Sequence, residues 1–257
     1  MTPVLVFDIE TVPDAAGLRR LWELDPGVSD AAVVDLATQR RRQATGNDFL
    51  PAHVQQVVAI SCALRSNDGV KVWSLGSPQD GEREIVQRFF DGIEKYTPQL
   101  VSWNGSGFDL PVLHYRALLH GIAGCCYWDT GENDKDFKYN NYLNRFHTRH
   151  LDLMDVLAGY QNRAWAPLDD IAHLCGLPGK IGMDGSQVGA AFRRGEVEAI
   201  RNYCETDVAN TYLLYQRFQL IRGTLNPEAY AKELELFRAW LATQPALHWK
   251  EFAVAWK

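Results

Sequence analysis

The chain has few cysteines, and they are not arranged as a disulfide framework or a structural zinc site requires. The five cysteines are odd in number and show no paired C-x-x-C spacing. No apolar run approaches the length of about 18 residues that a membrane-spanning helix needs. An apolar strand pattern begins at residue 4, which leaves no room for a signal peptide. These absences predict a soluble, cytoplasmic protein with no membrane partner.

The chain also lacks an excess of positive charge. Its 257 residues include 26 basic and 32 acidic side chains, for a formal net charge of −6. No broad nucleic-acid-binding surface is therefore indicated. A nucleic-acid enzyme is not excluded, because carboxylates clustered around metal ions contribute negative charge. We find no repeat, low-complexity tract or composition break, so we expect a single domain over residues 1–257.

The first apolar run, residues 4–7, leads into the acidic triplet Asp8-Ile9-Glu10. Branched and aromatic residues predict a buried strand, which Val12-Pro13-Asp14 should end. Because side chains alternate along a strand, Asp8 and Glu10 should project to the same side, about 7 Å apart. Two buried carboxylates repel each other and lose hydration, so a divalent cation is expected between them. Two acids in a solvated turn are the alternative.

Strand and helix patterns alternate along the rest of the chain and predict a mixed sheet with helices on its faces. Further strands are expected at 56–64, 70–75, 100–103 and near 150–152. The main helices are expected at 82–96, 110–120, 197–217 and 228–241, with an aromatic tail packed back on the domain. Asp109 is expected at the N-cap of the helix that follows the strand at 100–103.

Residues 15–50 are predicted to be an insertion that contains two short helices. Its second helix ends in Arg40-Arg41-Arg42. Three arginines suit the carboxyl end of a helix, and a phosphate-binding patch is the alternative.

Residues 124–149 are predicted to form a long loop in which basic and aromatic residues alternate. Lys138 and Arg145 stand among several aromatic side chains. Positive charge for phosphates and rings for bases are what a single-stranded nucleic acid requires. The alternative is an ordered loop packed on its own aromatic residues.

A second buried acid is predicted on the helix at 197–217. Tyr203 and Asp207 are four residues apart, so they share a helix face on or beside an apolar stripe. An aspartate there is costly unless it is paired or bound to metal. The glycine-rich loop at 178–185 lacks P-loop spacing, and its Lys180 either lies in a simple turn or contacts a phosphate.

Four acids therefore stand out: Asp8, Glu10, Asp109 and Asp207. Such a cluster could hold two Mg²⁺ or Mn²⁺ ions about 4 Å apart. One ion would activate a water molecule, and the other would stabilise the leaving 3′ oxygen of a phosphodiester. The sequence thus predicts metal-assisted phosphoryl transfer.

Three motifs, in order along the chain, resemble those of the DnaQ-like (DEDD) 3′–5′ exonucleases. They are the triplet Asp8-Ile9-Glu10, the stretch Asn104 to Asp109 and the stretch Tyr203 to Asp207. A tyrosine four residues before the last aspartate is typical of the DEDDy branch. The form Asn-x-x-x-Phe-Asp-Leu-Pro is similar to the proofreading domain of family B DNA polymerases. Most of the chain resembles a stand-alone bacterial family of polymerase-B-like exonucleases, although the insertion at 15–50 lies outside the proofreading pattern.

The resemblance implies an α/β, RNase H-like fold, with a mixed five-stranded sheet and helices on both faces. It also implies release of nucleoside 5′-monophosphates from the free 3′ end of single-stranded DNA or RNA. The four acids would hold two divalent metal ions, and Tyr203 would orient the attacking water. Asn104 and Phe108 would contact the terminal nucleotides, although Phe108 could instead be a core ring. The alternatives are a non-catalytic nucleic-acid- or partner-binding module, or the same metal site acting on a small nucleotide or a capped end.

Overall fold

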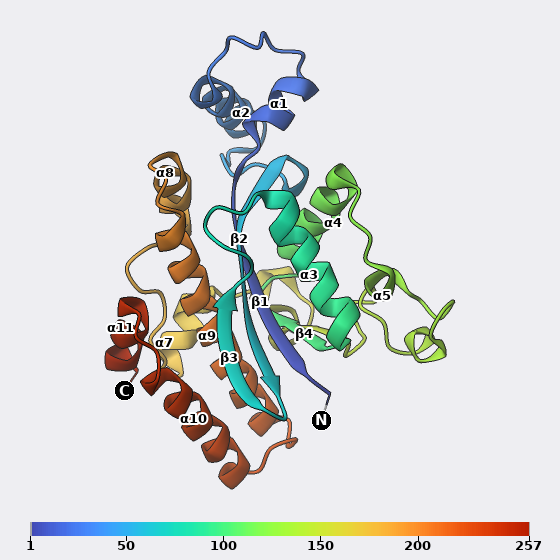
Figure 1. Cartoon of the computed structure of the whole chain (residues 1–257), viewed down its shortest axis with the longest axis vertical. Coiled ribbons are helices and arrows are strands. Elements are labelled where there is room, and N and C mark those ends of the chain that lie inside the picture. Colours follow the sequence, from blue (N-terminus) through green and yellow to red (C-terminus); the bar gives the residue numbers. More distant parts are fainter. Residues whose placement is uncertain (1, 257) are drawn as a thin grey trace.

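The computed structural model describes residues 2–256 and is built on a five-stranded mixed sheet (Figure 1). In the order β3-β2-β1-β4-β5, its strands are Gly69–Ser74, Gln55–Ser66, Val4–Pro13, Gln99–Ser102 and His150–Asp152. The pairs β1–β2 and β2–β3 are antiparallel, whereas β1–β4 and β4–β5 are parallel. The predicted RNase H-like fold class is therefore confirmed.

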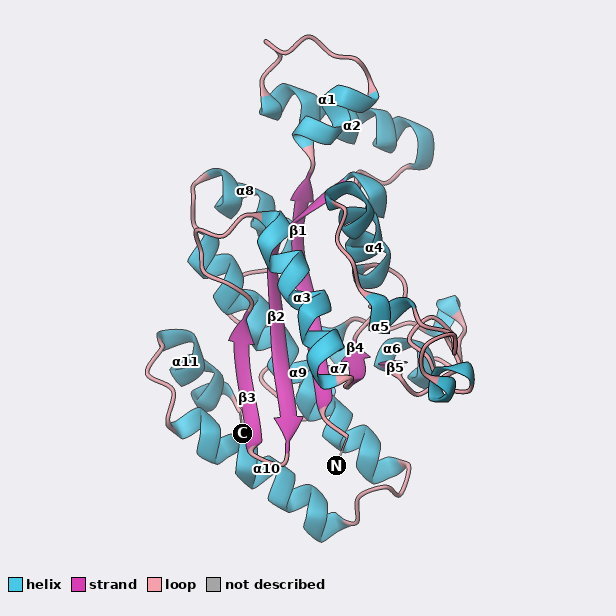
Figure 2. Ribbon diagram, turned by 45° about the vertical axis from the view of Figure 1, so that its right-hand side comes forward, coloured by secondary structure: helices cyan, strands magenta, loops and turns pink. Residues whose placement is uncertain are grey.

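Helices cover both faces of the sheet (Figure 2). One face carries α3 (Glu82–Tyr96), α4 (Asp109–His120) and the short α5 (Cys125–Trp128). The other carries α9, α7, α8, α10 and α11, which span Val197–Ile221, Leu168–Leu174, Val188–Arg193, Pro227–Ala242 and Leu247–Ala255. Apart from α1 and α2, described below, the other elements are short: α6 (Leu153–Leu157) and the 3₁₀ turns η1 to η4, at Ala52–Val54, Lys135–Lys138, Asn162–Ala164 and Gly185–Gln187.

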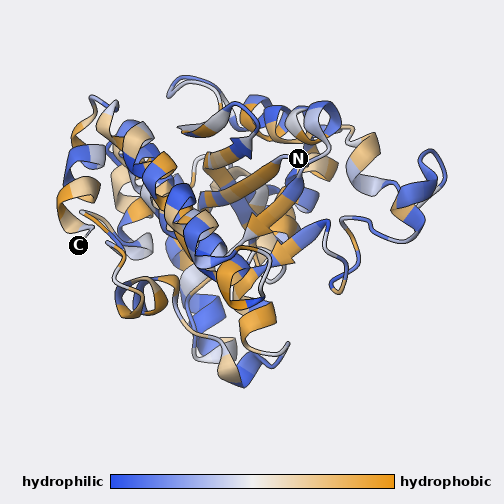
Figure 3. Ribbon diagram, turned by 90° about the horizontal axis from the view of Figure 1, so that it is seen from below, coloured by the Kyte–Doolittle hydropathy of each residue, from blue (hydrophilic) through white to orange (hydrophobic). Residues whose placement is uncertain are grey.

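The alternation of side chains along β1 divides the core in two. Leu5, Phe7 and Ile9 join the apolar cluster beneath α3 and α4, whereas Val4 and Val6 join the cluster beneath α9. Seen from below, the strands carry many hydrophobic residues, and the helices around them carry both hydrophobic and hydrophilic ones (Figure 3). The even-numbered acids of β1 consequently project toward α9.

The predicted insertion contains α1 (Ala15–Leu21) and α2 (Asp30–Thr45), which lie beyond the end of β1 at the top of Figure 1. It has a small apolar core formed by Leu18, Val33, Ala37 and Leu50, which Val54 of η1 completes from just beyond the insertion. The guanidinium of Arg40 lies 4.6 Å from the ring centroid of Trp22, Arg41 donates to the carbonyl of Phe49, and Arg42 pairs with Asp48 at 2.5 Å. All three arginines have partners inside the insertion, as expected for side chains that brace the end of a helix.

The aromatic tail packs back on the domain, as predicted, but it forms a helix that the sequence pattern did not predict. Trp249, Phe252 and Trp256, in and next to α11, are buried beside Phe237 of α10. Among residues 2–256, no helix is both long and apolar enough to span a membrane.

Candidate active site

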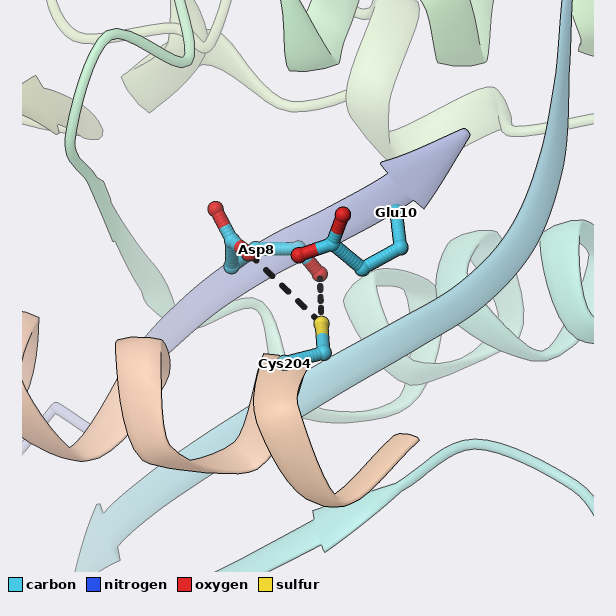
Figure 4. Close-up of side chains that lie close together, drawn as sticks. All are labelled: Asp8, Glu10 and Cys204. Atoms are coloured by element: carbon cyan, nitrogen blue, oxygen red, sulfur yellow. Dashed lines mark hydrogen bonds between the residues drawn. The ribbon is translucent and has the colours of Figure 1, made fainter. Parts of the chain in front are cut away.

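Two of the four predicted acids lie side by side on the α9 face of β1. Ligand atoms of Asp8, Glu10 and Cys204 of α9 lie within 4.8 Å of one another (Figure 4). The Cys204 thiol donates to the carbonyl oxygen of Asp8 at 3.4 Å and to its Oδ2 at 3.6 Å. Burial raises the pKa of this thiol, so Cys204 stays protonated and remains a donor. A β-bulge follows Glu10 and locally changes the course of the strand.

Asp109 reaches the same region from the other side of β1. The parallel pairing of β1 with β4 ends at Val6, so the N–H of Ile9 lies beyond it. The carboxylate of Asp109 accepts this N–H at 3.2 Å. The prediction that Asp109 caps its helix was wrong: Asp109 is the first residue of α4, and Phe108 holds the N-cap position without a side-chain hydrogen bond. Its carboxylate bonds to the strand instead of to its own helix.

Tyr203 and Asp207 are both buried on α9, on the side that faces the acids of β1. The Oδ1 atom of Asp207 is buried and has no hydrogen-bond partner within residues 2–256. Burial raises the pKa of Tyr203, and the nearby charge of Asp207 adds to the effect. The phenol therefore stays protonated at neutral pH and can donate a hydrogen bond.

Burial disfavours ionisation of all four acids, and repulsion by the other acids of the cluster adds to it at Asp8 and Glu10. Burial, followed by the charges of the other acids, holds the pKa values of Asp8 and Glu10 well above their usual range. Burial raises the pKa of Asp109 to about 7 and that of Asp207 to about 6. Lys180 opposes this trend by lowering the pKa of Glu10 and Asp207, and its Nζ lies 5.4 Å from the ring centroid of Tyr203.

The chemistry of this cluster fits divalent metal ions. None of the four carboxylates forms an ion pair with Lys, Arg or His in the part of the chain that the structure describes. Hard oxygen donors that lack a cationic partner, including the orphaned Oδ1 of Asp207, suit Mg²⁺ or Mn²⁺.

The turn from Asn104 to Asp109 is fixed by an acid to which the sequence motifs assign no role. Asp152, at the end of β5, accepts the backbone N–H groups of Asn104 and Ser106, each at 2.9 Å. Asn104 has a positive φ of 65°. Asp152 therefore holds the left-handed turn that leads into α4 and its first residue.

Phe108 is half-buried and has a partner that the sequence did not indicate. Its ring centroid lies 5.3 Å from that of Phe49, in the loop that returns from the insertion. Phe49 is 55% exposed, yet its backbone is held by Arg41 and by the Asn47 side chain. In the sequence, Phe49 is marked only as an aromatic residue that precedes a predicted strand, and this does not indicate that its ring contacts Phe108.

The basic loop only partly matches its prediction. Phe137 and Tyr142 are buried core rings, whereas Tyr139 and Phe146 are exposed. Arg145 makes two 2.7 Å hydrogen bonds to the buried carboxylate of Asp155 instead of standing free. Lys138 is exposed in η2, within the loop that follows α5 at the right of Figure 1. The structure thus brings Lys180 to the acids but not Lys138.

Comparison with known proteins places the chain in a family. Residues 47–256 match the family described as predicted 3′–5′ exonucleases related to the exonuclease domain of PolB. The chain belongs to this family. The matched range includes Asp109 and Asp207 and begins after β1 and the two helices of the insertion.

The similar proteins are much longer DNA polymerases. A DNA polymerase of Archaeoglobus fulgidus is 26% identical over 158 residues, which cover 60% of this chain and 19% of that protein. DNA polymerase 1 of Sulfurisphaera ohwakuensis is 39% identical over 75 residues, or 23% of this chain and 8% of that protein. The family B DNA polymerase of Pyrobaculum calidifontis is 17% identical with a TM-score of 0.49, over 84% of this chain and 24% of that one. The chain thus matches about a fifth or less of the length of these two curated relatives.

Proposed function

We propose that the protein is a metal-dependent 3′–5′ exonuclease that releases nucleoside 5′-monophosphates from single-stranded DNA or RNA. The observation that carries this proposal is the convergence, from β1, α4 and α9, of four carboxylates that form no ion pair within residues 2–256, of which Glu10, Asp109 and Asp207 are buried and Asp8 is half-buried. Such groups destabilise a fold unless a cation compensates them. Family membership supports the 3′–5′ direction of attack.

In this proposal Asp8, Glu10, Asp109 and Asp207 hold two divalent metal ions, Mg²⁺ or Mn²⁺. When bound, these ions supply an activated water and stabilise the leaving 3′ oxygen. Tyr203 positions the water through its protonated hydroxyl, since its raised pKa makes it unsuitable as a base.

Substrate binding is assigned to side chains around the acids. Lys180 faces the cluster and is exposed, so it can approach a phosphate of the strand. Phe108 and Phe49 offer ring surfaces to unpaired bases. The side-chain amide of Asn104, unlike its backbone N–H, has no hydrogen-bond partner within residues 2–256 and is available to the nucleotide. Arg145 would contact the substrate while it stays paired with Asp155. Lys138 would contact only a nucleic-acid strand that extends onto the loop at 124–149.

The test uses DNA and RNA oligonucleotides labelled at either end, with Mg²⁺, Mn²⁺ or EDTA. We expect a metal-dependent ladder from the 5′-labelled strand and early release of labelled mononucleotide from the 3′-labelled strand. Asp8→Asn should abolish both products. Asp91→Asn, at an exposed position of α3, is the matched control and should leave them unchanged.

Internal cleavage of either strand would contradict the exonuclease proposal, as would full activity of Asp8→Asn. A protein that binds the strands but cleaves none of them with metal present would be a binding module instead.

A further inference from the structure

A cavity of about 360 Å³ lies beside the turn from Asn104 to Ser106, and none of the four acids of the cluster lines it. Its walls come from this turn, from α4, from the loop at 124–149, and from the segment around η3. This volume is near the lower end of the range of about 300–1,000 Å³ for small-molecule sites. It therefore suits one base or nucleoside and is too small for a length of strand.

The charges around the cavity disfavour a phosphate. Its only Lys or Arg side chain is Arg145, which is already paired with Asp155, and Asp152 adds a second carboxylate. Burial lowers the pKa values of His114 and His150 to about 4, so both imidazoles are neutral at pH 7. The lining thus carries one positive and two negative charges, and an anion would be repelled.

The polar groups that remain free suit the edge of a heterocycle. Asn104 and Asn162 line the cavity, and the side-chain amide of neither residue has a hydrogen-bond partner in the part of the chain that the structure describes. An asparagine amide can donate to and accept from a base edge at the same time. Trp165, which is 38% exposed, offers a ring for stacking, and its Nε1–H is fixed by Asp155 at 3.3 Å.

We propose that this cavity binds a single unpaired nucleobase, with its sugar and phosphate left outside. The choice of a nucleobase rests on the proposed function, whereas the exclusion of the phosphate rests on the charges of the lining. The base belongs either to the strand that is being degraded or to a free nucleoside or nucleotide. Because Asn104 and Ser106 are tied to Asp152, the occupant would contact the same turn that leads to Asp109.

The test is calorimetric titration of the full chain with adenosine and with adenosine 5′-monophosphate, in EDTA so that the acid cluster holds no metal. We expect saturable binding of adenosine, with the monophosphate binding no more tightly. Asn162→Trp and, separately, Leu143→Trp should fill the cavity and weaken adenosine binding at least tenfold. Arg163→Trp, an exposed neighbour outside the lining, is the matched control and should bind as the wild type does.

Absence of saturable adenosine binding would overturn the proposal, and so would equal binding by folded Asn162→Trp and Leu143→Trp proteins. Binding of the monophosphate more than tenfold tighter than adenosine would also overturn it, by identifying a phosphate site. Because the titration needs no hydrolysis, an inactive protein that binds adenosine would refute only the proposed function. With active protein, a raised KM of Asn162→Trp for oligonucleotides identifies the strand as the source of the base, and an unchanged KM identifies a free nucleoside.

Discussion

Replacing Asp109 by Asn should stabilise the metal-free protein while abolishing its activity. Burial raises the pKa of Asp109 from its ordinary value of 3.8 to about 7. Between pH 3.8 and about pH 7, Asp109 is protonated in the folded chain but ionised in the unfolded chain. The free energy of unfolding therefore falls as the pH rises to about 7. This difference in pKa lowers the free energy of unfolding of the wild type by about 4 kcal/mol above pH 7 and by about 1–2 kcal/mol at pH 5. Asparagine keeps an acceptor for the N–H of Ile9 and carries no charge.

The assay is thermal unfolding in EDTA at pH 5 and pH 8, for the wild type, Asp109→Asn and the exposed control Asp91→Asn. The stability gained by Asp109→Asn over the wild type should grow by about 2–3 kcal/mol between the two pH values, or roughly 5–10 °C in Tm for a chain of this size. Adding Mg²⁺ at pH 8 should raise the Tm of the wild type more than that of the variant. An advantage that is the same at both pH values, or a variant less stable than the wild type at both, would refute the reasoning.

Three further predictions concern other side chains of the domain. Arg116→Ala should lower the free energy of unfolding by about 3–5 kcal/mol in denaturant titration, because it removes the guanidinium that pairs with the carboxylates of Asp14 and Glu82. Arg88→Ala, at an exposed pair, should cost less than about 1 kcal/mol. Phe49→Ala should raise KM for single-stranded oligonucleotides about 5- to 150-fold, because it removes a stacking surface beside Phe108. Phe49→Trp should keep the KM of the wild type. Equal KM values for Phe49→Ala and the wild type would exclude stacking on Phe49. Lys180→Met should weaken oligonucleotide binding measured in Ca²⁺ and reduce its dependence on salt, and an unchanged salt slope would exclude a phosphate contact.

Much of the fold follows from local signals in the sequence. The turn Ser66–Gly69 joins two strand patterns, and the apolar spacing of residues 82–96 together with Pro98 marks α3 at the observed bounds. Asp8 and Glu10 share a face because side chains alternate along any strand. The elements that the sequence predicts correctly are those marked by turn residues or by the regular spacing of apolar side chains along a strand or helix.

The contacts that complete the site depend on tertiary structure and have no local signal. Nothing near Phe49 indicates that the insertion returns to Phe108, and nothing near Arg145 indicates that Asp155 neutralises it. The role of Asp152 follows from the parallel pairing of β4 and β5, which brings residues 48 positions apart into contact. The short helices α8 and α11 contain too few turns for a periodic pattern to separate them from loops.

The measurement that tests the central claim most directly is a calorimetric titration of the metal-free protein with Mn²⁺ at pH 6.5. Repeating it in buffers of different ionisation enthalpy gives the number of protons released. We expect two Mn²⁺ ions per chain and a release of protons, because carboxylates with raised pKa values must ionise to bind metal. Asp8→Asn should lose this binding, and Asp91→Asn should retain it. No saturable binding of Mn²⁺ to the wild type, or undiminished binding to Asp8→Asn, would contradict the assignment of the four acids as a metal site.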